Sequence, residues 1–192
     1  MNLYDFDKTI FYRDSGSLFC LYCLRRHPTL FPYMLKSALY AALWGLKIVS
    51  AETFKTEAFS FLKKLDAEKE AEAFWNEYAP ERLTYYDGTA RPDDVICSAS
   101  PDFLVKAFFK KINPTATVIA TGCDLKTGRI IGKNCKGQEK VVRLKELGYD
   151  RFDNVYSDSL SDLPILSLGN NAFLIKKGKP TPFEVGQYTK KQ

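Results

Sequence analysis

Four aspartates, arranged in two pairs, are the residues of this sequence best suited to carry chemistry: Asp5 with Asp7, and Asp158 with Asp162. Each pair follows a short apolar run that predicts a buried strand. The carboxyl ends of parallel strands converge on one crevice, so the two pairs are expected to meet there. Four carboxylates in one crevice need a cation, and an all-oxygen site with room for water and phosphate oxygens suits Mg²⁺ better than zinc. Either pair alone is also typical of a solvated turn or a helix cap.

Three residues between these pairs are suited to binding a phosphoryl group. Ser98 ends another apolar run, Ala99 offers a backbone N–H just before a predicted helix, and Lys140 lies near the start of a later helix. Backbone N–H groups at a helix start and a lysine ammonium both bind anions. Taken singly, Ser98 is an ordinary loop serine and Lys140 an ordinary surface lysine, so only the combination indicates a phosphate site.

Composition argues against several other kinds of site. The 192-residue chain has one histidine, which argues against a Ser/His/Asp triad and a histidine-rich zinc site, so acid/base chemistry rests on carboxylates. Five cysteines, an odd number, favour a reducing, cytoplasmic setting. Cys20-x-x-Cys23 lies in an apolar, helix-like stretch and is predicted to pack in the core. The net charge of +5 comes mainly from residues 101–151, which hold eleven basic and five acidic residues and are interpreted as solvated helix faces.

The elements that must position these residues form an α/β pattern. Apolar runs alternate with helix-like segments after residue 92, which predicts a Rossmann-like parallel sheet with helices on both faces. The predicted strands are 3–6, 94–97, 117–120, 152–156 and 172–175, with a hairpin at 125–131. The predicted helices are 101–112, 138–147 and 161–168.

Residues 14–85 break this alternation and predict a helical insertion. The segment has few glycines, and its apolar residues recur at spacings of three and four, with separate helices expected at 51–65 and 67–78. Residues 31–49 are apolar and aromatic, but Lys36 and Lys47 interrupt them, so the uninterrupted part is too short to cross a bilayer. Two interpretations stay open: burial within the insertion, or peripheral membrane contact, because aromatic and basic residues occur together there.

In their order along the chain, the motifs closely resemble the four motifs of the haloacid dehalogenase-like (HAD) phosphohydrolases. The matching stretches are Asp5-Phe6-Asp7-Lys8-Thr9, Val95-Ile96-Cys97-Ser98, Gly137-Gln138-Glu139-Lys140 and Ser157-Asp158-Ser159-Leu160-Ser161-Asp162. The helical insertion between the first two stretches resembles the C1 cap of subclass IB, the phosphoserine-phosphatase-like subclass. The resemblance implies a core domain of residues 1–13 and 86–192 and a cap domain of residues 14–85.

The resemblance also implies roles for the aspartates. Asp5 would be the nucleophile that forms an aspartyl-phosphate, and Asp7 would be the general acid and then the general base. Mg²⁺ would be held by Asp5, the backbone carbonyl of Asp7 and Asp158, with Asp162 orienting its waters.

Further roles fall on residues near the phosphate and the leaving group. Ser98 and Ala99 would bind the phosphoryl oxygens together with Lys140, which would also be catalytic. Asp14 stands where phosphoserine phosphatases have a glutamate that meets the substrate amine, and the adjacent Arg13 argues against a small amino-acid substrate. Both residues are therefore candidate specificity residues.

We expect a Mg²⁺-dependent hydrolase of a small-molecule phosphate monoester, with no nucleic-acid partner. The sequence does not predict an oligomeric state. The alternatives that stay open are a lipid-phosphate phosphatase of the phosphatidylglycerophosphatase type and a phosphotransferase or mutase with the same aspartyl-phosphate. A non-enzymatic module that binds anionic lipid or nucleic acid is a third. It rests on the basic charge alone, because no interleaving of basic and aromatic residues accompanies that charge.

Overall fold

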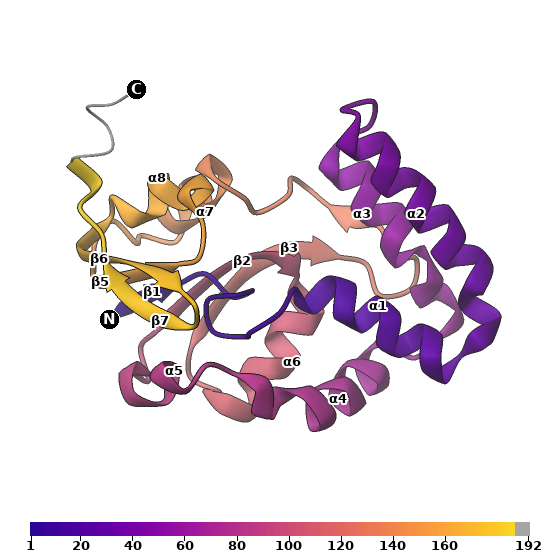
Figure 1. Cartoon of the computed structure of the whole chain (residues 1–192), viewed down its shortest axis with the longest axis horizontal. Coiled ribbons are helices and arrows are strands. Elements are labelled where there is room, and N and C mark those ends of the chain that lie inside the picture. The colour runs from indigo at the N-terminus through magenta and orange to yellow at the C-terminus, as the bar shows by residue number, and fades with distance from the viewer. Residues whose placement is uncertain (187–192) are drawn as a thin grey trace.

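The computed structural model describes residues 1–186, in which a seven-stranded sheet is flanked by helices (Figure 1). The strands lie in the order β4-β3-β2-β1-β5-β6-β7. Their bounds are β1 (Asn2–Tyr4), β2 (Val95–Pro101), β3 (Thr117–Cys123), β4 (Ile130–Ile131), β5 (Phe152–Ser157), β6 (Gly169–Lys176) and β7 (Lys179–Pro182). The helices are α1 (Ser15–Arg26), α2 (Phe31–Gly45), α3 (Ala51–Phe59), α4 (Ala67–Tyr78), α5 (Thr84–Thr89), α6 (Asp102–Ile112), α7 (Gln138–Glu146) and α8 (Leu163–Leu166).

The first strand of the chain is the central strand of the sheet. β1 pairs in parallel with β2 on one side and β5 on the other, with Leu3 opposite both Val95 and Val155. The carboxyl ends of these three strands therefore meet at one edge, where the strand order switches direction. The predicted α/β fold is confirmed.

The two edges of the sheet differ from the wholly parallel prediction. The predicted hairpin forms, because β4 pairs antiparallel with the end of β3. β7, which was not predicted, pairs antiparallel with β6 after a turn at Lys177 and Gly178, both with positive φ. β7 contains two prolines, which have no N–H to donate, and this composition hides a strand from a pattern search.

Three helix predictions were wrong in their bounds. The helix expected at 51–65 ends at Phe59 and continues as a 3-10 turn, Ser60–Lys64. The helix expected at 161–168 divides into a 3-10 turn, Leu160–Asp162, and the short α8, which has a proline in its first turn. The helix expected from residue 101 begins at Asp102, because Pro101 still pairs with β3 in an irregular extension of β2.

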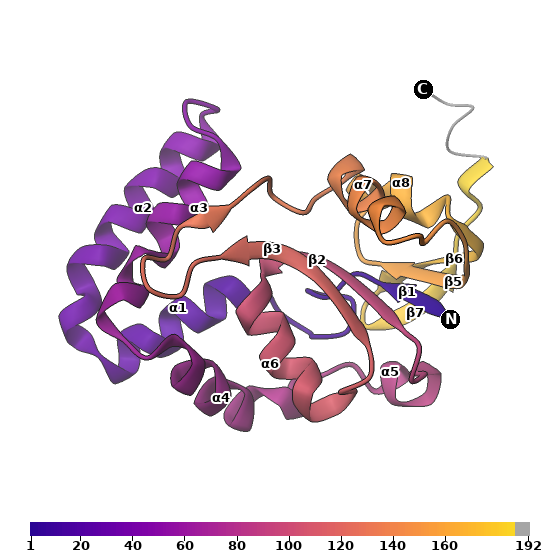
Figure 2. The same cartoon turned by 180° about the vertical axis from the view of Figure 1, so that it is seen from behind.

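Alternate residues of the central strands enter two separate cores. Tyr4 and Ile96 belong to the core on one face, with α1, α4 and α6, and Leu3 and Val95 belong to the core on the other face, with α7 and α8. Figures 1 and 2 show these two layers of helices on opposite sides of the sheet. This period of two is what the pleat of a strand requires.

The helical insertion joins β1 to β2 and contains α1 to α5. α4 packs along α6, where the indole N–H of Trp75 donates to the carbonyl of Leu104 at 2.7 Å. α2 and α3 pack on each other and project beyond the end of the sheet (Figures 1 and 2). Cys23 is buried in this region, Cys20 is half-buried, and both are free thiols. Within residues 1–186, no helix combines the length and apolar content that crossing a membrane requires.

Gly128, in the connection between β3 and β4, makes a close backbone contact with the helical insertion at Phe59. Its φ is +76°, and a Cβ at this position would lie 1.9 Å from the carbonyl oxygen of Phe59, at the end of α3. Only a residue without a side chain permits both this backbone conformation and this approach.

We predict that Gly128→Ala destabilises the protein by about 3 kcal/mol or more, because backbone overlap adds to left-handed strain. The matched control is Gly132→Ala, which also has a positive φ of +72° but has open space around its Cβ, and should cost only about 1 kcal/mol. Urea unfolding of both variants measures the difference. Equal losses would show that the contact with Phe59 is unimportant.

Candidate active site

The predicted carboxylates lie at the carboxyl ends of the two central strands. Asp5 follows β1, and its backbone N–H donates to the carbonyl of Tyr156 at 2.9 Å, which continues the pairing with β5. Asp158 and Asp162 follow β5 through a tight turn and a 3-10 turn. Asp5 and Asp162 are buried, whereas Asp158 is half-buried.

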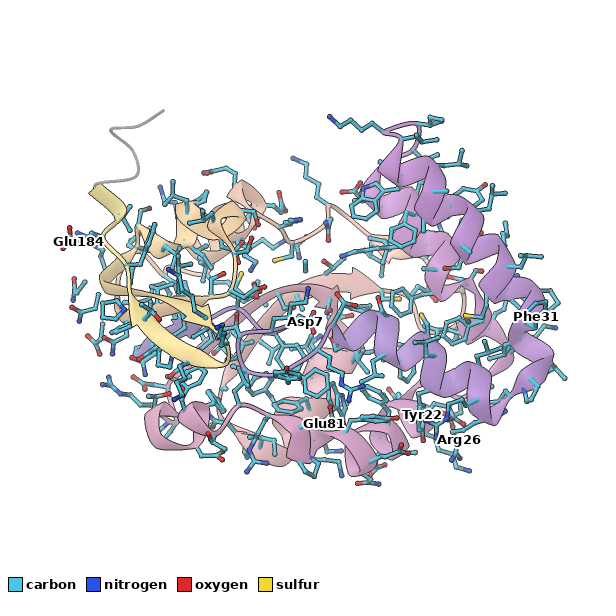
Figure 3. All side chains as sticks on the ribbon, viewed as in Figure 1. Asp7, Tyr22, Arg26, Phe31, Glu81 and Glu184 are labelled. Atoms are coloured by element: carbon cyan, nitrogen blue, oxygen red, sulfur yellow. The ribbon has the colours of Figure 1, made fainter. Side chains whose placement is uncertain are left out.

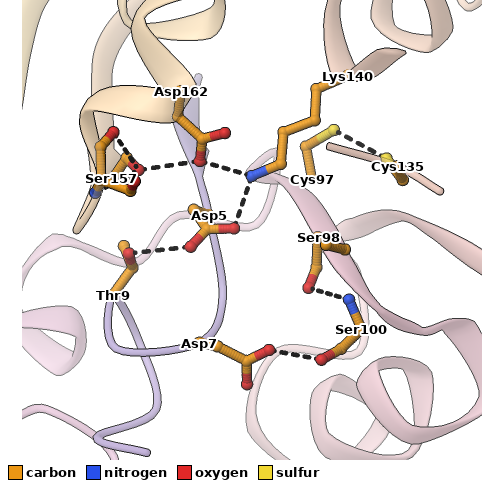
Figure 4. A network of polar contacts seen from close by, with 12 residues as sticks. Asp5, Asp7, Thr9, Cys97, Ser98, Ser100, Cys135, Lys140, Ser157 and Asp162 are labelled. Atoms are coloured by element: carbon orange, nitrogen blue, oxygen red, sulfur yellow. Dashed lines mark hydrogen bonds and ion pairs between the residues drawn. The ribbon is translucent and has the colours of Figure 1, made fainter. Parts of the chain in front are cut away.

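Lys140 joins Asp5 to Asp162 (Figure 4). Its Nζ lies 2.6 Å from Oδ1 of Asp5 and 2.7 Å from Oδ2 of Asp162, and the lysine side chain is 2% exposed. Hydroxyl groups occupy further carboxylate lone pairs: Thr9 donates to Oδ2 of Asp5 at 3.2 Å, and Ser157 donates to Oδ2 of Asp162 at 2.9 Å. The amine reaches this position because Gly137, with φ +57°, turns the chain into α7.

The charges in this cluster are only partly balanced. Burial raises the pKa of Asp5, and the Lys140 charge opposes that effect without cancelling it. Burial lowers the pKa of Lys140, but the charges of Asp5 and Asp162 outweigh burial and raise it overall, so the amine is protonated. Burial, followed by the charge of Asp5, raises the pKa of Asp158 to about 6. The cluster therefore contains three carboxylates and one ammonium. A further positive charge at this position would be electrostatically favourable.

Asp7 points away from this cluster toward the start of α1 (Figure 4). The backbone N–H of Ser15 donates to its Oδ1 at 2.8 Å, and the Ser100 hydroxyl donates to its Oδ2 in a short hydrogen bond. Burial raises the pKa of Asp7 to about 7, with a further contribution from the charge of Asp14, while the hydrogen bonds from Ser100 and Ser15 lower it. A carboxyl with this pKa exchanges a proton near neutral pH, which suits acid/base chemistry.

The Ser98–Ala99 segment of β2 directly precedes Ser100, whose hydroxyl contacts Asp7. Ser98 is buried, and its Oγ accepts the backbone N–H of Ser100 at 3.0 Å, which leaves its own proton available to an anion. The carbonyl of Ala99 accepts hydrogen bonds from Thr121 Oγ1 at 2.8 Å and from Lys55 Nζ at 2.6 Å. The peptide orientation at Ala99 is thus held from two sides.

Lys55, like Ser100, is a site-facing residue that the sequence analysis missed. It extends from α3, and its Nζ also donates to Oδ1 of Asn134 at 2.7 Å. Burial lowers the pKa of Lys55 to about 8, while the charges of Asp14 and Asp7 oppose that shift. No motif marks this lysine, but it lies with Glu52 and Thr56 on one helical face that touches residues 130–134.

The two candidate specificity residues lie in different surroundings. Asp14 caps α1 by accepting the N–H of Ser17 at 2.8 Å, and its charge acts on Asp7 and Lys55. The Nε of Arg13 pairs with Glu81 at 2.9 Å and the side chain is half exposed, so the structure does not bring Arg13 onto the carboxylate cluster.

The oxygen donors near Asp5 are of the kind that bind a cation together with water. Within the described part of the chain, no three Asp, Glu, His or Cys side chains converge tightly enough to hold a metal unaided. Asp162 is already engaged by Lys140 and Ser157. The Asp158 carboxylate makes no hydrogen bond or ion pair within residues 1–186 and lies in the field of Asp5. Carboxylates and a backbone carbonyl, with water and phosphate oxygens, are the donor types that a partly hydrated Mg²⁺ site uses.

Two surface hollows lie elsewhere. One of about 380 Å³ and one of about 740 Å³ are lined by residues around α4, and none of the predicted site residues lines either of them.

This geometry defines a class of protein: an α/β enzyme whose buried Asp–Lys–Asp cluster lies at the carboxyl edge of a parallel sheet. A model of the haloacid dehalogenase-like hydrolase family matches residues 3–167. The chain therefore belongs to the haloacid dehalogenase-like hydrolase family, and the predicted family and the prediction of an enzyme are confirmed.

Individual relatives agree with this assignment. Protein CicA of Caulobacter vibrioides is 28% identical over 203 residues, which cover 92% of this chain and 86% of that protein. A crystal structure of a protein of unknown function from Bordetella pertussis Tohama I has a TM-score of 0.73 and 19% identity, covering 91% of this chain and 88% of that one. A phospho-aspartyl intermediate analogue of phosphoserine phosphatase has a TM-score of 0.54 and 16% identity, covering 90% and 84%. The two structures share the fold with this chain.

We predict that Lys140→Met destabilises the protein by about 3 to 5 kcal/mol near neutral pH, because Asp5 and Asp162 lose their buried partner. Without that positive charge the folded-state pKa of Asp5 rises further above its ordinary value of about 4. The loss should therefore be small below that value and grow as the pH rises through the folded pKa.

Urea unfolding at several pH values measures this loss. The control is Lys110→Met on the exposed side of α6. A loss that did not depend on pH, or that matched the control, would contradict the assigned role of Lys140.

Proposed function

We propose that the protein is a Mg²⁺-dependent phosphomonoesterase that forms an aspartyl-phosphate on Asp5. The observation that carries the proposal is the buried Lys140 amine, which holds the Asp5 carboxylate at the end of the central strand. A carboxylate that is oriented but still lacks full charge compensation is suited to meeting a phosphoryl group together with a cation.

The first chemical step forms one bond and breaks another. An oxygen of Asp5 attacks phosphorus in line, the P–O bond to the leaving alcohol breaks, and Asp7 gives its proton to that alcohol. The pKa of Asp7 near 7 supports this role, because the carboxyl is substantially protonated at neutral pH. Ser98, the Ala99 N–H and Lys140 would bind the phosphoryl oxygens, a role that the buried Ser98 hydroxyl and the Lys140 charge beside Asp5 support.

The second step returns the enzyme to its starting state. Asp7, now ionised, takes a proton from water, and the oxygen of that water attacks phosphorus. The bond from phosphorus to Asp5 breaks, inorganic phosphate leaves, and the Asp5 carboxylate is regenerated. Splitting the displacement in this way replaces one difficult reaction with two easier ones.

Mg²⁺ would be held by Asp5, the backbone carbonyl of Asp7 and Asp158, with Asp162 orienting its waters. When bound, it supplies the positive charge that offsets the approach of a carboxylate to a phosphate dianion. Burial raises the pKa of both Asp5 and Asp158, and a neighbouring carboxylate raises each further, which supports this assignment because a bound cation would offset both effects.

We further propose that residues 14–85 form a cap over a core of residues 1–13 and 86–192. Two residues of this cap interact electrostatically near the site. The charge of Asp14 acts on both Asp7 and Lys55, and the charge of Asp7 acts on Lys55, which supports a specificity role for Asp14. The pairing of Arg13 with Glu81 argues for a structural role of that arginine in the state described. All five cysteines are free thiols, which supports a reducing, cytoplasmic setting.

A lipid phosphate is a second candidate substrate class, favoured by the exposed apolar side of α2. Peripheral membrane contact through the cap belongs to this candidate. A phosphotransferase would use the same Asp5 intermediate and differ only in passing the phosphoryl group to an alcohol. A panel of soluble phosphate esters and lysophosphatidylglycerol phosphate, with and without an added alcohol acceptor, separates these cases.

We predict that the purified protein hydrolyses a generic aryl phosphate with Mg²⁺, and that EDTA abolishes the reaction until Mg²⁺ is restored. Asp5→Asn should lose at least about a thousandfold in kcat, because the amide cannot form the acyl phosphate. Release of inorganic phosphate is the measurement. Activity that survived either EDTA or Asp5→Asn would refute the mechanism.

We predict that Lys55→Met lowers kcat for the aryl phosphate about tenfold, because it removes the hydrogen bonds to Ala99 and Asn134 that position the phosphate-facing loop. KM should change less than kcat, since the lysine acts through the loop. Lys64→Met, an exposed lysine of the same insertion, is the control. A change in KM alone would instead assign Lys55 to substrate binding.

A further inference from the structure

The outer side of α2 is an apolar surface that the other described residues, within 1–186, do not cover. No residue of this helix is buried, and Phe31, Leu35 and Leu39 are 61%, 64% and 57% exposed. Their spacing of four places them along one helical face. Figure 3 shows Phe31 at the outer rim of the molecule, on the side of α2 that faces away from Asp7. Contiguous apolar exposure of this kind is unusual in a protein that works alone in water.

The apolar surface continues into the connection between α2 and α3. Leu46 and Ile48 are 70% and 65% exposed, with the exposed Lys47 between them. Trp44 stacks on Phe54 of α3, with ring centroids 5.2 Å apart, and is still 44% exposed. Figures 1 and 2 show that this connection projects beyond the sheet. We call the set Phe31, Leu35, Leu39, Leu46 and Ile48 the α2 face.

The charged side chains of the chain segment that carries the α2 face have one sign. Residues 15–51 contain no aspartate or glutamate, whereas they contain Arg25, Arg26, Lys36 and Lys47. Arg26 and Lys36 pair with acidic residues from outside this stretch, Glu70 and Glu57, and both basic side chains remain half exposed. A helix with an apolar face, basic flanks and a tryptophan near one end has the character of an interfacial segment.

We propose that the α2 face docks on the surface of a bilayer that contains anionic phospholipid, with the α2–α3 connection inserted among the headgroups. Basic flanks complement the negative surface of such a bilayer. A second copy of this chain is the poorer occupant, because a two-fold interface would bring these basic flanks together with no acidic residue of the stretch to pair with them. The face lies on the membrane and does not cross it.

Docking also sets the position of the active site. α2 packs on α3, and Lys55 of α3 contacts the Ala99 carbonyl beside Ser98. Two packed helices, α2 and α3, therefore lie between the bilayer and the phosphate-facing loop. Membrane binding does not depend on the proposed function, whereas the consequence that the enzyme acts on phosphate esters presented at a lipid surface does rest on it.

Vesicle flotation of the full-length protein tests the proposal. Vesicles of phosphatidylcholine mixed with phosphatidylglycerol should carry the protein upward at low salt, vesicles of phosphatidylcholine alone should carry much less, and high salt should weaken the binding. The double variant Leu35→Glu/Leu39→Glu should reduce the fraction bound at least about tenfold. Leu147→Glu adds one glutamate where the double variant adds two, at a 58% exposed leucine beyond α7, and should bind nearly as the wild type does.

Other outcomes overturn the proposal. Failure of the wild type to float with anionic vesicles, or flotation of the double variant at the wild-type level, would remove it. A dimer in sedimentation velocity that the double variant converts to a monomer would assign the α2 face to self-association. Thermal melting of both variants checks that they fold. Asp5→Asn should float as the wild type does, so loss of membrane binding and failure of the catalytic proposal are separate results.

Discussion

The ammonium of Lys140, buried between the carboxylates of Asp5 and Asp162, is the interaction on which the rest of the site depends. It joins three parts of the chain, the end of β1, the start of α7 and the turn after β5, at distances of 2.6 and 2.7 Å. A buried carboxylate without such a partner carries a large desolvation penalty. Because Asp158 lies in the same field, one lysine leaves the cluster short of positive charge. The same interaction therefore orients the Asp5 carboxylate and leaves negative charge in the cluster that a divalent cation would balance.

The sheet makes this contact possible by placing the first strand at its centre. β1 is only three residues long, yet it pairs with β2 and β5 and contributes to both cores. Asp5 continues its pairing with β5, and Asp7 turns to the N–H of Ser15 at the start of α1. Two aspartates separated by one residue thereby enter different surroundings. Asp5 is held beside a lysine and is suited to attack, whereas Asp7 is held among hydrogen-bond donors with a pKa near 7 and is suited to proton transfer.

The insertion has two sides with opposite properties. The inner side of α3 brings Lys55 onto the Ala99 carbonyl, and the end of α3 packs on Gly128 so closely that no side chain fits there. The outer side of α2 is apolar, exposed and free of acidic residues. If the proposed docking holds, the insertion contacts lipid through α2 and the Ala99 carbonyl through α3, which connects the site of membrane binding to the active site.

The sequence by itself determined the alternation of strands and helices, the place of the insertion and the types of group that would meet at the sheet edge. These features depend on local periodicity and on the order of motifs, which tertiary contacts do not change. The sequence did not predict the roles of Lys55 and Ser100 or the second edge strand, β7. The division of the 161–168 helix reflects local turn geometry that periodicity does not encode. The orientation of Arg13 toward Glu81 and the exposure of α2 were decided only by tertiary structure. Each depends on which distant residues approach, such as Lys55 and Ala99, 44 positions apart, and no local pattern reports that approach.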